Sequence, residues 1–149
     1  MNPASTRRLS AAFAFLYLVG MLSLLVQHVV AADAPGDVER GRQFFQRNCT
    51  ACHSADLDAN FHGPALGGAY GRTAGHAPGY RYSVAMRAYG RRWTPATLDA
   101  FLADSARAVP GTFMAVRIAA PQDRADLIAF LRQEAGRRNW EARRRAGEH

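Results

Sequence analysis

Cys49-Thr50-Ala51-Cys52-His53 is the stretch of this sequence that decides the fold. Two cysteines two residues apart, followed at once by a histidine, form the attachment signature of a c-type haem: the thiols form thioethers with the haem vinyl groups and the histidine reaches the iron. The chain has no other cysteine, so no thiol is left for a structural disulfide. Zinc usually needs four ligands, and no second cysteine pair or closely spaced histidine pair is present. A thioredoxin-like redox pair would need a βαβ setting. The motif therefore predicts one haem c, covalently bound through Cys49 and Cys52.

The composition indicates one domain with extensions and a basic charge of local origin. The 149 residues carry a net charge of +7, all of it from arginine because the chain contains no lysine. Arg7 and Arg8 lie near the N-terminus, which leaves 17 arginines against 12 acidic residues from Asp33 onward, with three of them in the run 143–145. The excess charge is partly a property of the C-terminus, so it identifies no acidic partner. We expect no nucleic-acid partner.

The first 32 residues have the pattern of an export signal. Arg7 and Arg8 precede an uncharged run from Leu9 to Ala32, and Val30-Ala31-Ala32 is an acceptable cleavage site before Asp33. The alternative is an uncleaved membrane anchor, because a 24-residue run is long enough to span a bilayer. Both interpretations place the haem domain outside the cytoplasm, in the periplasm.

The remaining sequence predicts an all-α domain over 33–136 and a basic tail over 137–149. We expect a first helix capped by Asp37, a loop over 63–79, a short helix over 82–89 that ends at Gly90, a helix that starts at Thr94-Pro95, and a last helix from Pro121. No window alternates as a strand would. Four to five short helices in about 100 residues make a thin core, so we expect them to wrap around the haem. The tail is most simply a solvated, disordered extension, although Trp140 and the three adjacent arginines could contact anionic lipid or an acidic partner.

Several further motifs recur in order and with similar spacing in one family. They are Gly36-Asp37-Val38-Glu39-Arg40-Gly41, Gly63-Pro64-Ala65-Leu66, Tyr70-Gly71-Arg72, Ala77-Pro78-Gly79-Tyr80-Arg81-Tyr82, Trp93, Pro110-Gly111-Thr112-Phe113-Met114 and the segment 124–131. With the haem motif they make the chain resemble class I cytochrome c, the small monohaem electron carriers, over nearly all of 36–133. The resemblance implies the class I cytochrome c fold.

The resemblance also implies roles for single residues. The residues alone leave four candidates for the second iron ligand, namely His62, His76, Met86 and Met114; the family pattern selects Met114, so that the iron ligands are His53 and Met114. Further implied roles are a carbonyl at Pro64 that holds His53, propionate contacts from Arg72, Tyr82 and Trp93, and a propionate-side hydrogen bond from Thr112. Gly41, Phe45, Leu127 and Phe130 are implied to join the first and last helices.

Two departures from the family pattern affect function. Phe101 stands where many relatives have a tyrosine whose hydroxyl approaches the axial sulfur. The lysines that relatives place around the haem edge are mostly replaced by uncharged residues, while Arg107 remains: Asn48, Ala106, Phe113, Ala120 and Pro121.

The function implied is one-electron transfer without catalysis, in a periplasmic respiratory or dehydrogenase-linked chain. The partners would be redox proteins, such as a quinol–cytochrome c oxidoreductase, a terminal oxidase or a periplasmic dehydrogenase, with membrane contact through the N-terminal segment or the basic tail. The alternative is a ligand-binding haem sensor or haem enzyme with a labile axial methionine.

Overall fold

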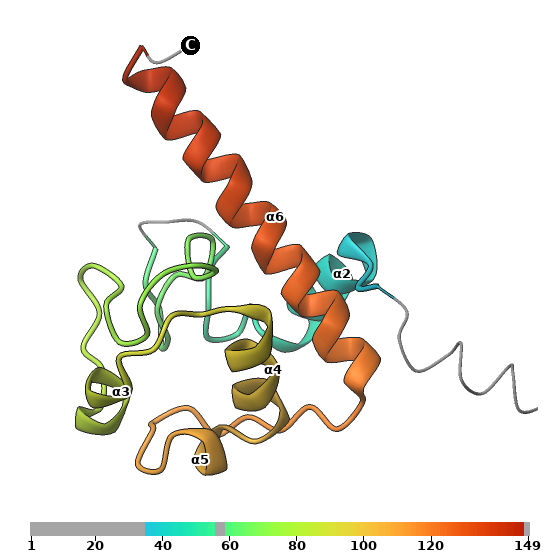
Figure 1. The fold of residues 1–149 in the computed structure, drawn as a ribbon, viewed down its shortest axis with the longest axis vertical. Helices are drawn as coiled ribbons and strands as arrows, with labels where there is room; N and C mark the ends of the chain where they lie inside the picture. Colours follow the sequence, from blue (N-terminus) through green and yellow to red (C-terminus); the bar gives the residue numbers. More distant parts are fainter. Residues whose placement is uncertain (1–34, 56–58, 148–149) are drawn as a thin grey trace, which may run out of the picture. The chain divides into compact units, whose positions relative to one another are not determined.

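The computed structural model describes residues 35–55 and 59–147, and within them the secondary structure is helical (Figure 1). The helices are α2 (Val38–Asn48), α3 (Val84–Tyr89), α4 (Pro95–Ala103), α5 (Ser105–Ala108) and α6 (Pro121–Arg145). Strand pairing in these ranges is limited to the isolated bridges His53–Asn60 and Thr73–Arg92. The predicted all-α class is therefore confirmed. The predicted signal or anchor segment, 1–32, lies outside the described residues.

Short polar side chains start the helices where the sequence predicts them. The Asp37 carboxylate accepts a hydrogen bond from the Arg40 N–H at the start of α2. Thr94 and Thr97 cap each other's backbone N–H groups ahead of Pro95 in α4. The helix α3 begins two residues later than expected, because the Ser83 hydroxyl caps it by accepting from the Met86 N–H. These caps fix where each helix enters the core.

The last helix is longer than expected. It runs for 25 residues to Arg145, so the prediction of a disordered tail from residue 137 is wrong for the described part of that segment. One tertiary contact and one contact within the helix support the continuation: Arg138 donates a hydrogen bond to the Ala55 carbonyl, and Arg137 pairs with the nearly buried Glu134 one turn earlier in α6. No helix within 35–55 and 59–147 is both long and apolar enough to cross a bilayer.

The first and last helices cross at backbone contact. A methyl group built on Gly41 would overlap the Asp126 carbonyl oxygen and lie 2.9 Å from the Phe130 Cβ. One built on Gly36 would overlap the Ala125 carbonyl oxygen. Next to this crossing the rings of Phe45 and Phe130 lie 5.3 Å apart, in the same buried cluster as Leu127. The predicted contact between the two helices is therefore confirmed.

A buried carboxylate also joins α2 to α6. The Asp126 side chain is 4% exposed and accepts from the Arg40 Nε at 2.7 Å, the Asp37 backbone N–H at 2.7 Å and the Gln122 side-chain amide at 2.8 Å. The hydrogen bond from Arg40 is the main reason why the pKa of Asp126 is lowered, and burial opposes it. The charged form of this carboxylate is the one that the fold requires.

We expect Asp126→Asn to lower the free energy of unfolding at pH 7 by roughly 2–3 kcal/mol, because it removes a buried, hydrogen-bonded charge. A carboxyl with a lowered folded-state pKa stabilises above its unfolded pKa of about 3.9 and loses that contribution as the pH falls through the folded value. The wild-type stability should therefore fall toward the variant's below about pH 4. Denaturant unfolding of the holoprotein from pH 7 to pH 3 measures this, and parallel pH profiles would contradict it.

Candidate haem-binding site

A cavity of about 880 Å³ lies among α2, α3, α4 and α6, within the range of protein cofactor sites. All nine residues that the sequence assigns to the cofactor line it: Cys49, Cys52, His53, Pro64, Arg72, Tyr82, Trp93, Thr112 and Met114. Its apolar wall includes Leu98, Phe101, Leu102, Leu127 and Leu131. Residues as far apart in sequence as Cys49 and Met114 thus line one cavity. Its size and its mostly apolar wall suit a large apolar cofactor that carries a few polar substituents.

The two thiols follow directly from the end of α2. The Cys49 N–H completes the helix by donating to the Phe45 carbonyl, and the Cys49 carbonyl accepts from Cys52 and His53 in a tight turn. Cys52 is exposed, whereas Cys49 is partly buried. Burial, and to a smaller extent the neighbouring Cys52, raises the pKa of the Cys49 thiol to about 11. Cys49 is therefore a neutral thiol in the cavity wall, the form that adds to a haem vinyl group. No group of three or more His, Cys, Asp or Glu side chains gathers into a metal site in the described part of the chain.

His53 is buried and held in one orientation. Its Nδ1 lies 2.7 Å from the Pro64 carbonyl oxygen, which can only accept, so Nδ1 carries the proton and Nε2 has the free electron pair. Burial lowers the pKa of His53, which favours the neutral ring, while the bond to Pro64 opposes this. The ring also lies against Gly63, where a methyl group would come within 2.6 Å of Nδ1. A neutral imidazole fixed through one nitrogen is a standard metal ligand.

Arg72 places a partly buried positive charge in the cavity wall. Burial lowers its pKa, and the Tyr82 hydroxyl beside it opposes that effect. Its Nη2 donates to the Ala65 carbonyl at 3.2 Å, and no carboxylate in the described ranges pairs with it. A desolvated guanidinium of this kind fits an anionic substituent such as a haem propionate. The cavity, the fixed imidazole, the paired thiols and this cation together match the chemistry of haem c.

Met114 enters the cavity from a turn. Gly111 has φ of 89°, a conformation that glycine adopts without strain, and the Thr112 N–H donates to the Val109 carbonyl. The Thr112 hydroxyl then accepts from the Met114 N–H at 3.3 Å. Among the other ligand candidates, His62 and Met86 line the cavity, whereas His76 does not and bonds the Ala74 carbonyl. Phe101 lines it too, so its wall lacks a hydroxyl at that position.

Sequence reasoning missed Ser105, the support of the Met114 segment. Its side chain is fully buried; its hydroxyl donates to the Met114 carbonyl at 2.6 Å and accepts from the Val116 N–H at 2.9 Å. Its own N–H donates to the Val116 carbonyl at 3.1 Å. The signal was weak, because a serine after an aspartate predicts only a short helix start. Asn60 was missed as well: its side chain accepts from the Ala65 N–H and donates to the Pro78 carbonyl, and no local pattern indicates either bond.

We expect Ser105→Ala to lower the free energy of unfolding by about 1–3 kcal/mol, because the Met114 carbonyl and the Val116 N–H both lose a buried partner. Amide hydrogen exchange at Val116 in the holoprotein should become faster. Ser83→Ala is the matched control, since Ser83 is also a buried serine whose hydroxyl accepts from a backbone N–H, but that N–H belongs to Met86. Equal exchange at Val116 in both variants would show that Ser105 does not hold this segment.

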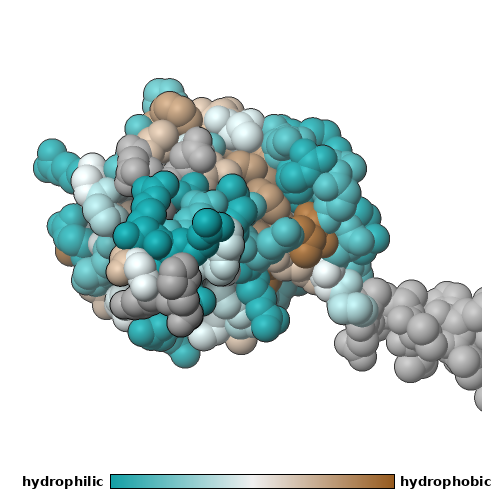
Figure 2. Space-filling model, turned by 90° about the horizontal axis from the view of Figure 1, so that it is seen from above, coloured by the Kyte–Doolittle hydropathy of each residue, from teal (hydrophilic) through white to brown (hydrophobic). Residues whose placement is uncertain are grey.

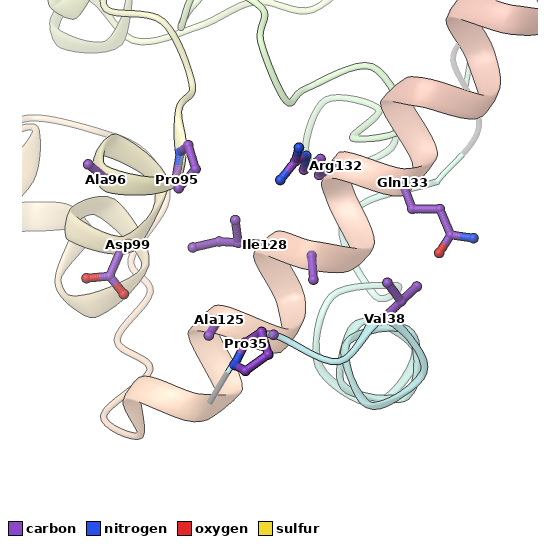
Figure 3. Close-up of a pocket in the computed structure, with 11 residues that line it drawn as sticks. Pro35, Val38, Pro95, Ala96, Asp99, Ala125, Ile128, Arg132 and Gln133 are labelled. Atoms are coloured by element: carbon purple, nitrogen blue, oxygen red, sulfur yellow. The ribbon is translucent and has the colours of Figure 1, made fainter. Parts of the chain in front are cut away.

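A second hollow of about 800 Å³ lies on another face, between α4, α6 and the start of α2 (Figure 3). Ile128 points from α6 toward α4, and Pro35, Val38 and Pro95 add apolar surface. Its charged lining residues are Asp99 and Arg132. None of the residues assigned to the cofactor lines this hollow; all nine line the first cavity.

Comparison with known proteins identifies the same region. The sequence profile of the cytochrome c family matches residues 38–135. Cytochrome c of Euglena viridis is 44% identical over 98 residues, which cover 65% of this chain and 96% of that protein. Cytochrome c2 of Rhodomicrobium vannielii is 39% identical over 120 residues, which cover 79% of this chain and 95% of that protein. Among solved structures, cytochrome cH from Methylobacterium extorquens matches with a TM-score of 0.61 and 39% identity, over 66% of this chain and 99% of that one.

Proposed function

Because this chain belongs to the cytochrome c family, we propose that it carries electrons between redox proteins of a periplasmic respiratory or dehydrogenase-linked chain. The protein is a class I monohaem cytochrome c, with one haem c attached through Cys49 and Cys52, and it acts in electron transfer rather than catalysis. The observation that supports a carrier is the meeting of His53 and Met114 in one largely apolar cavity beside the paired thiols.

The proposed iron ligands are His53 and Met114. When bound, the haem supplies reversible one-electron chemistry at its iron. Pro64 fixes the imidazole of His53 through Nδ1, and Ser105 fixes the backbone of Met114, so both ligands are positioned before any electron arrives. Two neutral ligands and apolar walls favour the reduced, less charged iron, which raises the reduction potential.

Arg72, Tyr82, Trp93 and Thr112 are proposed to hold the propionate side. Arg72 supplies a positive charge that is already desolvated, and Tyr82 lies next to it. Trp93 packs its ring on Phe101 at 5.2 Å and exchanges backbone hydrogen bonds with Gly71 and Arg72, which fixes the loop that carries Arg72. Placing charge compensation inside the wall lets the cavity exclude water without leaving an anion unpaired.

Redox partners are proposed to dock at the cavity rim near the thioethers. The rim residue Phe113 is 78% exposed, and Asn48, Ala119 and Ala120 line the same opening. Apolar contact should therefore contribute more to docking than electrostatic steering does. A quinol–cytochrome c oxidoreductase, a terminal oxidase and a periplasmic dehydrogenase all remain candidate partners of this kind.

Residues 1–32 are proposed to export the chain and to be cleaved before Asp33, with an uncleaved anchor as the alternative. Mass spectrometry of the holoprotein from the cell would distinguish them: the signal-peptide proposal requires a chain that starts at Asp33, and a mass that includes residues 1–32 would contradict it.

The carbon monoxide difference spectrum of the dithionite-reduced holoprotein tests the carrier against a ligand-binding sensor or haem enzyme. We expect no change, because the Met114 sulfur keeps the sixth position closed. Met114→Ala is the positive control and should bind carbon monoxide. A prompt change in the wild type would favour the sensor or enzyme. Silence in both proteins would keep the carrier but move the sixth ligand to His62 or Met86.

A further inference from the structure

The segment of α6 beyond the family match is a basic helix that is fixed to the domain. The match ends at residue 135, yet the helix continues to Arg145. Between 136 and 147 the sequence holds five arginines and one glutamate, Glu141. Figure 1 shows these last turns (red) extending past the loops that the helix packs against. None of the residues of this extension lines the cofactor cavity.

The inner side of the extension is anchored. The Arg138 Nη2 donates to the Ala55 carbonyl at 2.5 Å, and its guanidinium packs on Gly67, where a methyl group would lie 2.8 Å from Cζ. Arg137 pairs with Glu134 at 2.5 Å and lies 3.8 Å from Glu141. These contacts use two of the five arginines and the one acid, and they set the direction in which the last turns point.

The outer side combines an indole with the remaining cations. Trp140 is 52% exposed, and the Arg144 guanidinium lies over its ring, 4.7 Å from the centroid. Arg143, three residues after Trp140 and so on the same helix face, is exposed, and Arg145 in the last turn is exposed as well. Figure 2 looks onto this end of the molecule, and the surface nearest the viewer is mostly hydrophilic. Within 35–55 and 59–147 no carboxylate pairs with Arg143, Arg144 or Arg145, so this end of the helix presents an indole and three cations to the surroundings.

We propose that this helix end, Trp140 with Arg143, Arg144 and Arg145, binds the surface of a membrane that contains anionic lipids. Guanidinium groups bind lipid phosphates with paired hydrogen bonds, and indoles settle at the headgroup level. A protein groove would instead need apolar anchors at successive turns, and Trp140 is the only large apolar residue that the extension exposes. Anionic lipid therefore fits this surface better than an apolar protein groove does.

The length of α6 separates this surface from the electron port. The rim residues Ala120 and Asp123 lie at the start of α6, and Leu131 is the last residue of this helix that lines the cavity. At 1.5 Å per residue Arg143 is about 30 Å from Asp123 and about 18 Å from Leu131 along the helix. Binding lipid at the C-terminal end would hold the protein at a membrane while the cavity rim stays open to partners, whichever partners those are.

Vesicle binding tests the proposal independently of electron transfer. The holoprotein that begins at Asp33 is suitable, because Pro35–His149 is a compact unit by itself. We expect it to bind vesicles of phosphatidylcholine with phosphatidylglycerol and not vesicles of phosphatidylcholine alone. Arg143→Gln/Arg144→Gln/Arg145→Gln should weaken binding roughly a hundredfold, and Trp140→Ala should weaken it without changing the net charge.

The control is Arg47→Gln/Arg81→Gln/Arg91→Gln, which removes the same charge from exposed positions outside α6. It should bind within about threefold of the wild type. Trp140 emission should shift to the blue on binding, whereas Trp93 lies in the cavity wall and should not respond. Equal losses in the two triple variants would show a net-charge effect and overturn the proposal. Absence of binding to the anionic vesicles at low salt would overturn it as well, and would leave an acidic protein as the partner.

Discussion

The mature chain without haem should be largely unfolded. The space that the cofactor fills, about 880 Å³, lies at the centre of the domain and borders both clusters of buried side chains. Without the cofactor the apolar wall of this space would face water, and the burial lost is large compared with the 5–15 kcal/mol by which whole domains are stable.

Cys49→Ala/Cys52→Ala, expressed without haem attachment, provides that chain. Its far-ultraviolet circular dichroism should show most of the helical signal lost and no cooperative thermal transition, while the holoprotein melts cooperatively. Retained helix content with a sharp melting transition in the haem-free chain would show that the helices make a sufficient core by themselves.

Gly41→Ala should lower the free energy of unfolding of the holoprotein by about 4 kcal/mol or more. The added methyl group overlaps the Asp126 carbonyl oxygen and crowds the Phe130 Cβ, so α2 must move away from α6. That movement also stretches the bonds from Arg40 and Asp37 to the buried carboxylate of Asp126.

Gly136→Ala is the matched control, because it is the same change in a helix of the same protein. A methyl group there meets no atom within 4 Å, and replacing a helical glycine should stabilise the protein by about 0.5–1 kcal/mol. Urea unfolding of the two holoproteins should therefore give shifts of opposite sign. A loss at Gly41 no larger than 1 kcal/mol would mean that the two helices can separate at little cost.

The features that the sequence predicted well are those with short-range causes. The haem motif, the caps at Asp37 and Thr94, and the turn at Gly111 each depend on a few adjacent residues. Other features depend on partners outside the local turn or helix, and these were missed. Ser105 bonds Met114, nine residues later, and the helix beyond residue 136 is held by the bond from Arg138 to Ala55. Asn60 belongs to the same group. A serine or an arginine looks the same in sequence whether its partner is water or a distant carbonyl, so these roles needed the fold.

The nine residues that the family resemblance assigns to the cofactor all line one cavity, a grouping that periodicity alone could not predict. Tyr82 and Trp93, for example, would pack in any small domain. In the structure both lie beside Arg72: the Trp93 N–H donates to the Arg72 carbonyl, and the Tyr82 hydroxyl is next to the Arg72 guanidinium.

The crossing of α2 and α6 also determines the route by which the chain folds. Arg40 and Asp126 are 86 positions apart, so their contact closes almost the whole domain into one loop. Closing so long a loop carries a large entropic cost before any contact repays it, and contacts of high sequence separation slow folding. Covalent attachment at Cys49, one residue after α2 ends, places a large apolar surface beside that helix while the rest of the chain is still unfolded. Segments that pack on this surface shorten the search for α6, so the cofactor should speed folding as well as stabilise its product.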